Sequence, residues 1–373
     1  MPRDDEPGRR PLEIALVSTS AVSTPPRAYG GTELFVAELA RGLVDLGHRP
    51  TVFATGDSTC AGVRRWTIER AVWPPDTLTE LRHAGFAWTE LAAGSFDVAH
   101  VNHAAAIPFH ELVGVPTVLT VHHDREESLA RHYARYPDVA YVAISDRQRE
   151  LSPDIPFRDV IRHGVSIDRY EAGDGAGAYC AFLGRLAPEK GPHLAIEAAR
   201  MARKPIRVGG EAHHVAQRFF EREVLPRIAA PGVEWLGEVG GDAKLSLLRG
   251  AACLLFPIQW EEPFGLVMIE AMLVGTPVIA FARGSVPEVV EEGVTGHVVR
   301  TVAEMADRVR TVAGLDRRLC RARARERWSS SRMAREYVAL YDGVIADRRL
   351  HEARVRGRTG ADHDRTGTGA ARR

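Results

Sequence analysis

Short apolar runs alternate with longer stretches in which apolar residues recur every three or four positions, from about residue 12 to residue 349. Ten of the short runs predict strands, at 12–18, 50–55, 97–101, 117–121 and 141–144 in the first half and at 178–184, 205–210, 233–237, 252–257 and 277–282 in the second. Several are apolar throughout, as in strands buried on both faces of a parallel sheet. Strands that alternate with helices in this way predict a doubly wound α/β fold.

Two stretches predict long amphipathic helices. Residues 32–48 carry one apolar stripe, formed by Leu34, Phe35, Leu39, Leu43 and Leu46. Thr32 is expected to cap the N-terminus of this helix, and Gly47 to end it. The second helix, over residues 326–349, has an apolar side formed by Trp328, Met333, Tyr337, Leu340 and Tyr341.

A glycine-rich segment at 171–178 has no large apolar side chain and separates two halves of similar pattern. A chain of 373 residues also favours two domains over one. We therefore predict domains at 12–170 and 178–325, with the last helix, 326–350, packed as a separate element. The charged ends at 1–11 and 351–373 lack an apolar period and are predicted to be disordered.

The composition adds little about partners. Lys and Arg number 49, as do Asp and Glu, so no net charge favours nucleic acid. Cys60, Cys180, Cys253 and Cys320 lie far apart, which fits a reducing cytoplasm and neither a zinc ribbon nor a disulfide framework. No apolar run reaches the roughly 18 residues of a membrane span. Residues 131–137 are basic and aromatic, as a peripheral membrane contact would be, but lack an amphipathic period.

Two loops follow strands at the same place in each half, where ligands bind in open α/β sheets. Residues 29–33 read Tyr-Gly-Gly-Thr-Glu, and the glycines let a ligand approach a helix N-terminus, although a plain tight turn fits equally well. Residues 184–191 place Arg185 and Lys190 before a helix that opens at Pro192. Because Lys occurs only at 190, 204 and 244, this loop reads as a diphosphate site rather than as solvated surface charge.

The third segment, 262–272, has Glu262 in a loop and Glu270 about two turns into a helix that begins near Phe264. Two carboxylates on one pocket wall accept hydrogen bonds from hydroxyls of two sugar rings. Gly265 and Leu266 present backbone N–H groups to a phosphate. A helix with an acidic N-terminus would explain Glu262, but it does not explain an acid at 270 in an apolar stretch.

The fourth segment, 121–124, holds two histidines after a strand. Its spacing to Asn102, His103 and His110 fits no known metal-ligand pattern, and we expect no metal site. His122 at the strand end is expected to bind a substrate hydroxyl; a structural histidine is the alternative.

At these residues the chain resembles family 4 of the retaining glycosyltransferases, which share the GT-B fold of two Rossmann-like domains facing across a cleft. The resemblance covers nearly all of residues 12–349 and is carried by 29–33, 184–191, 262–272, 275–280 and 284–296. The spacing of Glu262 and Glu270, with seven residues between them, matches the family's hallmark. Glu211 and His163 depart from the common pattern, which leaves the donor open.

The resemblance implies a metal-independent transferase without a cofactor, which moves a sugar from a nucleotide-diphosphate donor to an acceptor bound by the N-terminal domain. The C-terminal domain would hold the donor, and the last helix would cross back to the N-terminal domain. Arg185 and Lys190 would hold the diphosphate, with Gly31 near it. Glu270 would bind the ribose. The donor sugar would meet Glu262, His122 and the backbone near Phe264, Gly265 and Leu266.

No side chain stands out as a nucleophile, so the implied catalysis rests on stabilising the departing diphosphate, which takes the acceptor proton in a front-face, retaining reaction. Two alternatives remain: a nucleotide-sugar epimerase of GT-B fold, and a sugar-nucleotide-binding protein without turnover. The sequence does not define the acceptor or the donor base, for which UDP and GDP are favoured.

Overall fold

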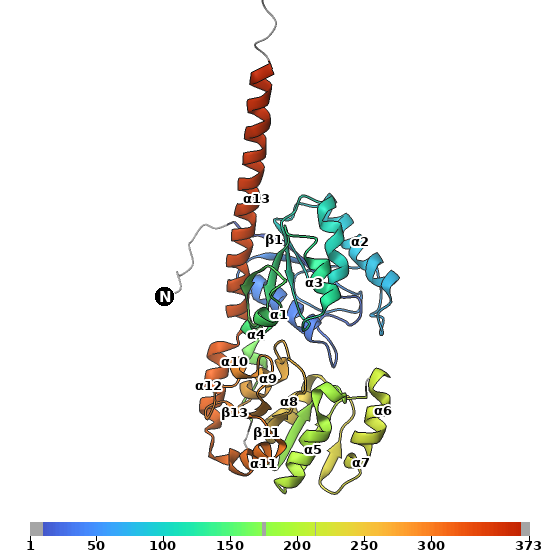
Figure 1. Cartoon of the computed structure of the whole chain (residues 1–373), viewed down its shortest axis with the longest axis vertical. Helices are drawn as coiled ribbons and strands as arrows, with labels where there is room; N and C mark the ends of the chain where they lie inside the picture. Colours follow the sequence, from blue (N-terminus) through green and yellow to red (C-terminus); the bar gives the residue numbers. More distant parts are fainter. Residues whose placement is uncertain (1–9, 174–176, 213, 367–373) are drawn as a thin grey trace, which may run out of the picture.

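The computed structural model describes residues 10–173, 177–212 and 214–366, and its strands form two parallel sheets, one above the other in Figure 1. The arm at 1–9, part of the predicted linker (174–176) and residues 367–373 of the predicted tail lie outside the described residues. The prediction of a doubly wound α/β fold is confirmed.

The first sheet has seven strands in the order β3-β2-β1-β4-β5-β6-β7. Its strands are β1 Glu13–Val17, β2 Arg49–Phe53, β3 Val63–Arg65, β4 Val98–Val101, β5 Thr117–Thr120, β6 Ala140–Ala143 and β7 Phe157–Val160. The helices and helical turns between and after them are α1 Gly31–Asp45, α2 Thr77–Ala93, η1 Ala104–Leu112, α3 Glu127–Tyr133, α4 Asp146–Leu151 and η2 Ile167–Arg169.

The second sheet has six strands in the order β10-β9-β8-β11-β12-β13. Its strands are β8 Tyr179–Leu183, β9 Ile206–Gly209, β10 Val233–Trp235, β11 Ala251–Phe256, β12 Val278–Phe281 and β13 Gly296–Val299. Its helices and helical turns are η3 Pro188–Lys190, α5 Pro192–Met201, η4 His214–Ala216, α6 Gln217–Phe219, η5 Phe220–Val224, α7 Leu225–Ile228, α8 Gly241–Arg249, α9 Leu266–Leu273, α10 Val286–Val289, α11 Val302–Thr311, η6 Val312–Gly314, α12 Arg317–Arg327 and α13 Ser330–Thr366.

All ten predicted strands are present, and the three that the pattern missed, β3, β7 and β13, are edge strands. Their sequences are short, and those of β3 and β7 are polar, with residues that are half-buried or exposed. A strand with one neighbour does not need the continuous apolar run that marks a central strand.

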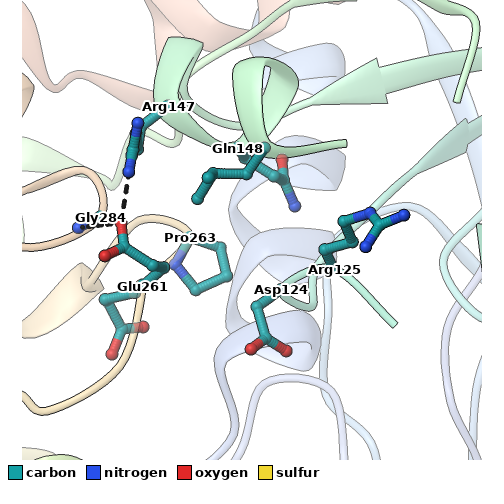
Figure 2. A pocket seen from close by; sticks show the side chains of 9 residues that line it. Asp124, Arg125, Arg147, Gln148, Glu261, Pro263 and Gly284 are labelled. Carbon is teal, nitrogen blue, oxygen red and sulfur yellow. Dashed lines mark hydrogen bonds and ion pairs between the residues drawn. The ribbon is translucent and has the colours of Figure 1, made fainter. Parts of the chain in front are cut away.

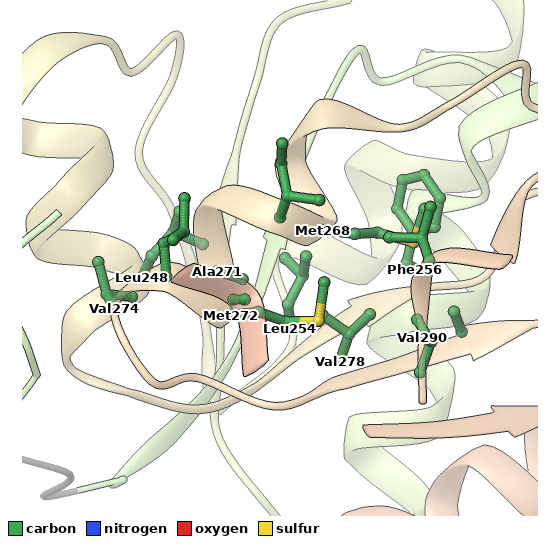
Figure 3. Packing of buried hydrophobic residues seen from close by; sticks show 14 of the residues in the cluster. Leu248, Leu254, Phe256, Met268, Ala271, Met272, Val274, Val278 and Val290 are labelled. Carbon is green, nitrogen blue, oxygen red and sulfur yellow. The ribbon is translucent and has the colours of Figure 1, made fainter. Parts of the chain in front are cut away.

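Apolar side chains fill both faces of each sheet. Figure 3 shows one such layer in the second domain, where Met268, Ala271 and Met272 of α9 pack against Leu254 of β11 and Val278 of β12. Burial of an apolar side chain contributes about 1.5–3 kcal/mol. This layer therefore holds α9, and with it the segment that carries Glu270, firmly on the sheet.

The prediction that Thr32 caps α1 is wrong, because the helix begins one residue earlier and Gly30 is its N-cap, with no side-chain hydrogen bond. Gly30 has a φ of 164°, and a Cβ there would lie 2.8 Å from both Glu33 and Pro26. The loop packs so closely onto the helix at this position that a side chain would not fit. Gly47 follows the helix end with a φ of 81°, which confirms its predicted place.

The last helix, α13, leaves the second domain and runs along the first, past which it projects (Figure 1). Met333, Tyr337 and Tyr341 of α13 are fully buried in the core of the first domain, against α1. The prediction that the chain is disordered from residue 351 is wrong for residues 351–366, which belong to α13. A helix that is already nucleated over its first turns extends at little cost, and Arg348 pairs with Glu352 one turn later.

Candidate active site

Lys190 and Glu262 form a buried ion pair on the side of the second domain that faces the first. The Lys190 Nζ lies 2.5 Å from Glu262 Oε2, and the two residues are 7% and 8% exposed. Trp260 donates a hydrogen bond of 3.0 Å to the same carboxylate oxygen, and its ring lies 4.7 Å from the Lys190 Nζ. Burial lowers the pKa of Lys190, but Glu262 and Tyr29 together outweigh burial, so the pKa is raised above its ordinary value.

Two glycines bring these charges together. Gly191, directly after Lys190, has a φ of 70°, and a Cβ there would lie 2.2 Å from the carbonyl oxygen of Pro257. Gly284 has a φ of 54° and packs equally closely against the backbone of Glu262. Because L-residues with a side chain rarely adopt this φ, only glycine lets both loops lie against their neighbours.

Glu270 points from α9 into a second polar cluster. Its Oε1 accepts hydrogen bonds from Lys244 Nζ at 2.5 Å and from the Tyr170 hydroxyl at 3.0 Å. Glu270 is 3% exposed, so these two partners offset the cost of a buried carboxylate. Burial, and next the charge of Glu270, raise the pKa of Tyr170 well above its ordinary value.

The N-termini of α9 and α1 face each other across the cleft between the domains. A Cβ on Gly31, at the start of α1, would lie 3.8 Å from a methyl group of Leu266, at the start of α9. Gly265 caps α9 with a φ of 79°, and Phe264 before it is buried. The first N–H groups of each helix have no partner within that helix, so both ends direct donors and positive partial charge toward this gap.

Arg185 lies close to the loop that precedes α1. Its guanidinium pairs with Glu189 at 3.0 Å and lies 5.9 Å from the ring of Tyr29, which belongs to the first domain. The positive charge of Arg185 also acts on Lys190 and lowers its pKa, as a minor effect. Arg185 and Lys190 therefore lie close enough to act on each other, and Arg185 reaches the loop directly before α1.

His122 lies at the carboxyl end of β5 and is oriented by Asn102. The Asn102 Nδ2 donates to the Val17 carbonyl at 3.1 Å, so its Oδ1 is left to accept from His122 Nε2 at 3.0 Å. The ring packs against Phe35 and stacks on His163, with centroids 4.8 and 5.5 Å apart. Burial, and next the neighbouring histidines, lower the pKa of His122 well below its ordinary value. The neutral ring thus carries its proton on Nε2, and Nδ1 is an acceptor.

Further contacts join the domains beside Glu262. The Glu261 carboxylate accepts from Arg147 Nε at 3.1 Å and from the Gly284 N–H at 3.0 Å, as Figure 2 shows. The Glu288 carboxylate accepts from the backbone N–H groups of Asp146 and Arg147, at 3.0 and 2.8 Å. These bonds fix the second domain to the N-terminus of α4 in the first.

A cavity of about 250 Å³ opens beside His122 in the first domain. It lies at the carboxyl ends of β4 and β5, and its lining includes Asn102, His103, His122 and Tyr133. Tyr133 is buried in the core of this domain, so its ring does not form the basic and aromatic membrane surface considered for 131–137.

Among the described residues, no group of three or more His, Cys, Asp or Glu side chains is placed to hold a metal ion. In the same part of the chain no helix is long and apolar enough to cross a membrane.

The loops predicted from the sequence bring Lys190, Glu262, Arg185, Gly31 and the start of α9 to one place, with Glu270 in a neighbouring cluster of the same domain. Besides Lys190, the two acids have the partners Trp260, Tyr170 and Lys244, which the sequence did not indicate. The rarity of Lys, which singled out Lys190, applies equally to Lys244. Two residues depart from the family pattern. The ring of His163 packs against that of Phe264, with centroids 4.8 Å apart, whereas Glu211 is exposed.

Two Rossmann-like domains with this cleft define the GT-B class, and comparisons with known proteins agree. The model of Glycosyltransferase Family 4 matches residues 29–169, and that of Glycosyl transferases group 1 matches residues 174–328. In both of its domains the chain thus resembles the family 4 glycosyltransferases.

Curated relatives of this chain carry the name D-inositol 3-phosphate glycosyltransferase. That of Mycobacteroides abscessus is 32% identical over 216 residues, 51% of this chain and 47% of the relative. That of Streptomyces scabiei is 31% identical over 181 residues, 41% and 39% of the two chains. The match thus spans about half or less of the length of these relatives.

Among solved structures, AviGT4, a glycosyltransferase involved in avilamycin A biosynthesis, aligns with a TM-score of 0.73 at 26% identity, over 90% of this chain and 98% of its own. HepE of Anabaena, solved with UDP and glucose, aligns with a TM-score of 0.70 at 18% identity, over 89% and 99%. The second likeness shows the fold alone.

Proposed function

We propose that this protein is a retaining, metal-independent glycosyltransferase that moves a sugar from a nucleoside-diphosphate donor to an acceptor hydroxyl. One observation carries this proposal. Lys190, Arg185 and the N-termini of α1 and α9 all lie where the two domains come together. An anionic diphosphate is the ligand that two cations and two helix N-termini bind in common. UDP bound to HepE is consistent with such a donor.

In this proposal the positive groups stabilise the diphosphate as it leaves with negative charge. Electrostatic stabilisation of developing charge contributes more than any other effect to catalysis in many enzymes, and here it replaces the charge of a metal ion. Glu262 is proposed to bind the hydroxyls of the donor sugar and Glu270 those of the ribose. His122 accepts a hydrogen bond from the sugar through Nδ1. The departing phosphate oxygen takes the proton of the acceptor hydroxyl, and front-face attack retains the anomeric configuration.

The domains are proposed to close over the donor, which excludes water and limits hydrolysis. The contacts of Glu261 and Glu288 support this role, because they join the domains beside the donor site. A cytoplasmic location, where sugar nucleotides are made, fits the free buried thiols of Cys180 and Cys253, whose sulfurs lie 3.9 Å apart.

Calorimetric titration with UDP, GDP, ADP and dTDP in the presence of EDTA tests the donor site. Binding of one of them without metal supports the proposal and fixes the base. The matching sugar nucleotide is then incubated with acceptor, and proton NMR of the product reads its anomeric configuration. A free epimerised sugar would identify an epimerase, and tight binding without any turnover would identify a binding protein.

A further inference from the structure

The cavity of about 250 Å³ beside His122 has a lining that sets it apart from a phosphate site. Among the described residues that line it, none is Lys or Arg; the polar ones include Thr32, Asn102, His103, His122, His123 and Tyr133. The cavity shares His122 with the proposed donor site, so a molecule bound there lies next to the donor sugar. A role for this cavity in holding the acceptor therefore rests on the proposed function.

The histidines of the cavity present little positive charge. Burial lowers the pKa of His103 to about 3 and also lowers the pKa of His122, so both rings are neutral at pH 7. His123 is occupied on both nitrogens, by the Asp124 carbonyl at 2.6 Å and the Tyr133 hydroxyl at 2.7 Å. The polar surface available to a ligand is therefore made of neutral groups.

His103 has an unmet hydrogen-bonding capacity. Both of its ring nitrogens are shielded from solvent and have no partner among the described residues. A buried imidazole without partners is costly, and a ligand that bonds to it recovers that free energy. One nitrogen of a neutral ring donates and the other accepts. A hydroxyl group can both donate and accept, and so matches either nitrogen.

A phosphate ester is a poor match for the same lining. Its ionised oxygens only accept at neutral pH, so they make no hydrogen bond to the accepting nitrogen of His103. Burial of its charge needs a compensating cation. The N-terminus of α1 at Thr32 supplies only about half an elementary charge.

We infer that the acceptor is an uncharged, hydroxyl-rich molecule that places a single ring in this cavity, and that His103 forms hydrogen bonds with its hydroxyls. The volume lies below the range of about 300–1,000 Å³ for drug-sized ligands, which favours one ring over an oligosaccharide. This separates the chain from the relatives that are named for D-inositol 3-phosphate.

The test uses the full chain loaded with the nucleoside diphosphate identified by calorimetry. Saturation-transfer NMR measures binding of myo-inositol and methyl α-D-glucopyranoside against D-inositol 3-phosphate and glucose 6-phosphate. The uncharged compounds are expected to bind at least about tenfold more tightly. Equal or tighter binding of the phosphate esters, or binding of none of the four, overturns the inference.

Variants at His103 test whether this residue binds the hydroxyls of the acceptor. His103→Leu is expected to weaken the uncharged ligands by about tenfold, and His103→Gln, which keeps a donor and an acceptor, by less. Nucleoside diphosphate affinity, unchanged in both, shows that the fold and the donor site are intact. Equal loss in both variants removes His103 from recognition. If no nucleoside diphosphate binds even the wild-type chain, the proposed function has failed, independently of the acceptor.

Discussion

Lys190 and Glu262 lie 2.5 Å apart and bury each other's charge on the side of the second domain that faces the first. When the donor binds, its diphosphate would replace Glu262 as the partner of Lys190. A sugar hydroxyl would replace Lys190 as the partner of Glu262. The ion pair therefore keeps both side chains in place without leaving either charge unpaired, which would cost several kcal/mol.

Replacing Lys190 with Ala is expected to weaken nucleoside diphosphate binding by about ten- to a hundredfold, because a charged hydrogen bond to phosphate is lost. Binding of the nucleoside alone should change little. Calorimetry with both ligands measures the difference, and Lys204→Ala, an exposed lysine, is the control. Equal weakening of both ligands would mean that Lys190 does not touch phosphate.

Glu262→Ala is expected to abolish transfer because the donor sugar loses its partner, and to lower the melting temperature because Lys190 loses its buried partner. Nucleoside diphosphate affinity should not weaken, since Lys190 stays available to phosphate. Initial rates of product formation and the melting temperature are the measurements. Glu234→Gln, at an exposed acid, controls for loss of charge. Activity above about a tenth of the wild-type rate would remove Glu262 from the mechanism.

Glu270→Ala is expected to erase the preference for ribose. The wild-type protein should bind a ribonucleoside diphosphate about tenfold or more tightly than its 2′,3′-dideoxy form, and the variant should bind both alike. Asp242→Ala, at an exposed acid close to Lys244 in sequence, is the control. A preference that survives in Glu270→Ala would place the ribose elsewhere.

Glu288→Gln is expected to loosen the contact between the domains. The Glu288 carboxylate accepts from two backbone N–H groups of α4 and from Arg162 at 2.9 Å, and weakening these bonds should lower the free energy of unfolding by about 1–2 kcal/mol. Small-angle X-ray scattering should show a larger radius of gyration than in wild type. Glu326→Gln serves as the exposed control, and an unchanged radius with unchanged stability would contradict this role.

Stability is expected to fall as pH drops below about 6.5, the ordinary pKa of histidine. Burial lowers the pKa of His100 and His163 to about 3, so between these values the unfolded chain binds protons that the folded chain does not. Each histidine then contributes about 1.4 kcal/mol per pH unit to the loss. Urea unfolding between pH 7 and pH 4.5 should show a shallower slope for His100→Asn and an unchanged slope for the exposed His351→Gln.

The sequence predicted the central strands and the loops that carry charge, because both leave local marks: continuous apolar runs, glycines, and rare lysines. It did not predict which side chains hold Glu270, since Tyr170 and Lys244 come from distant segments and carry no local pattern. The same holds for His122, whose proton is placed by Asn102 and the Val17 carbonyl. Such details depend on three-dimensional neighbours rather than on periodicity.

The two passages of the chain between the domains lie side by side, where Val165 pairs with Trp328 and Ser330 through backbone hydrogen bonds of 2.9 Å. The second passage delivers α13 into the core of the first domain. During synthesis on the ribosome, the core of the first domain therefore stays incomplete until the last helix has been made. A nascent chain that stops before residue 330 should stay sensitive to protease in its first domain, although every strand of that domain has already been synthesised.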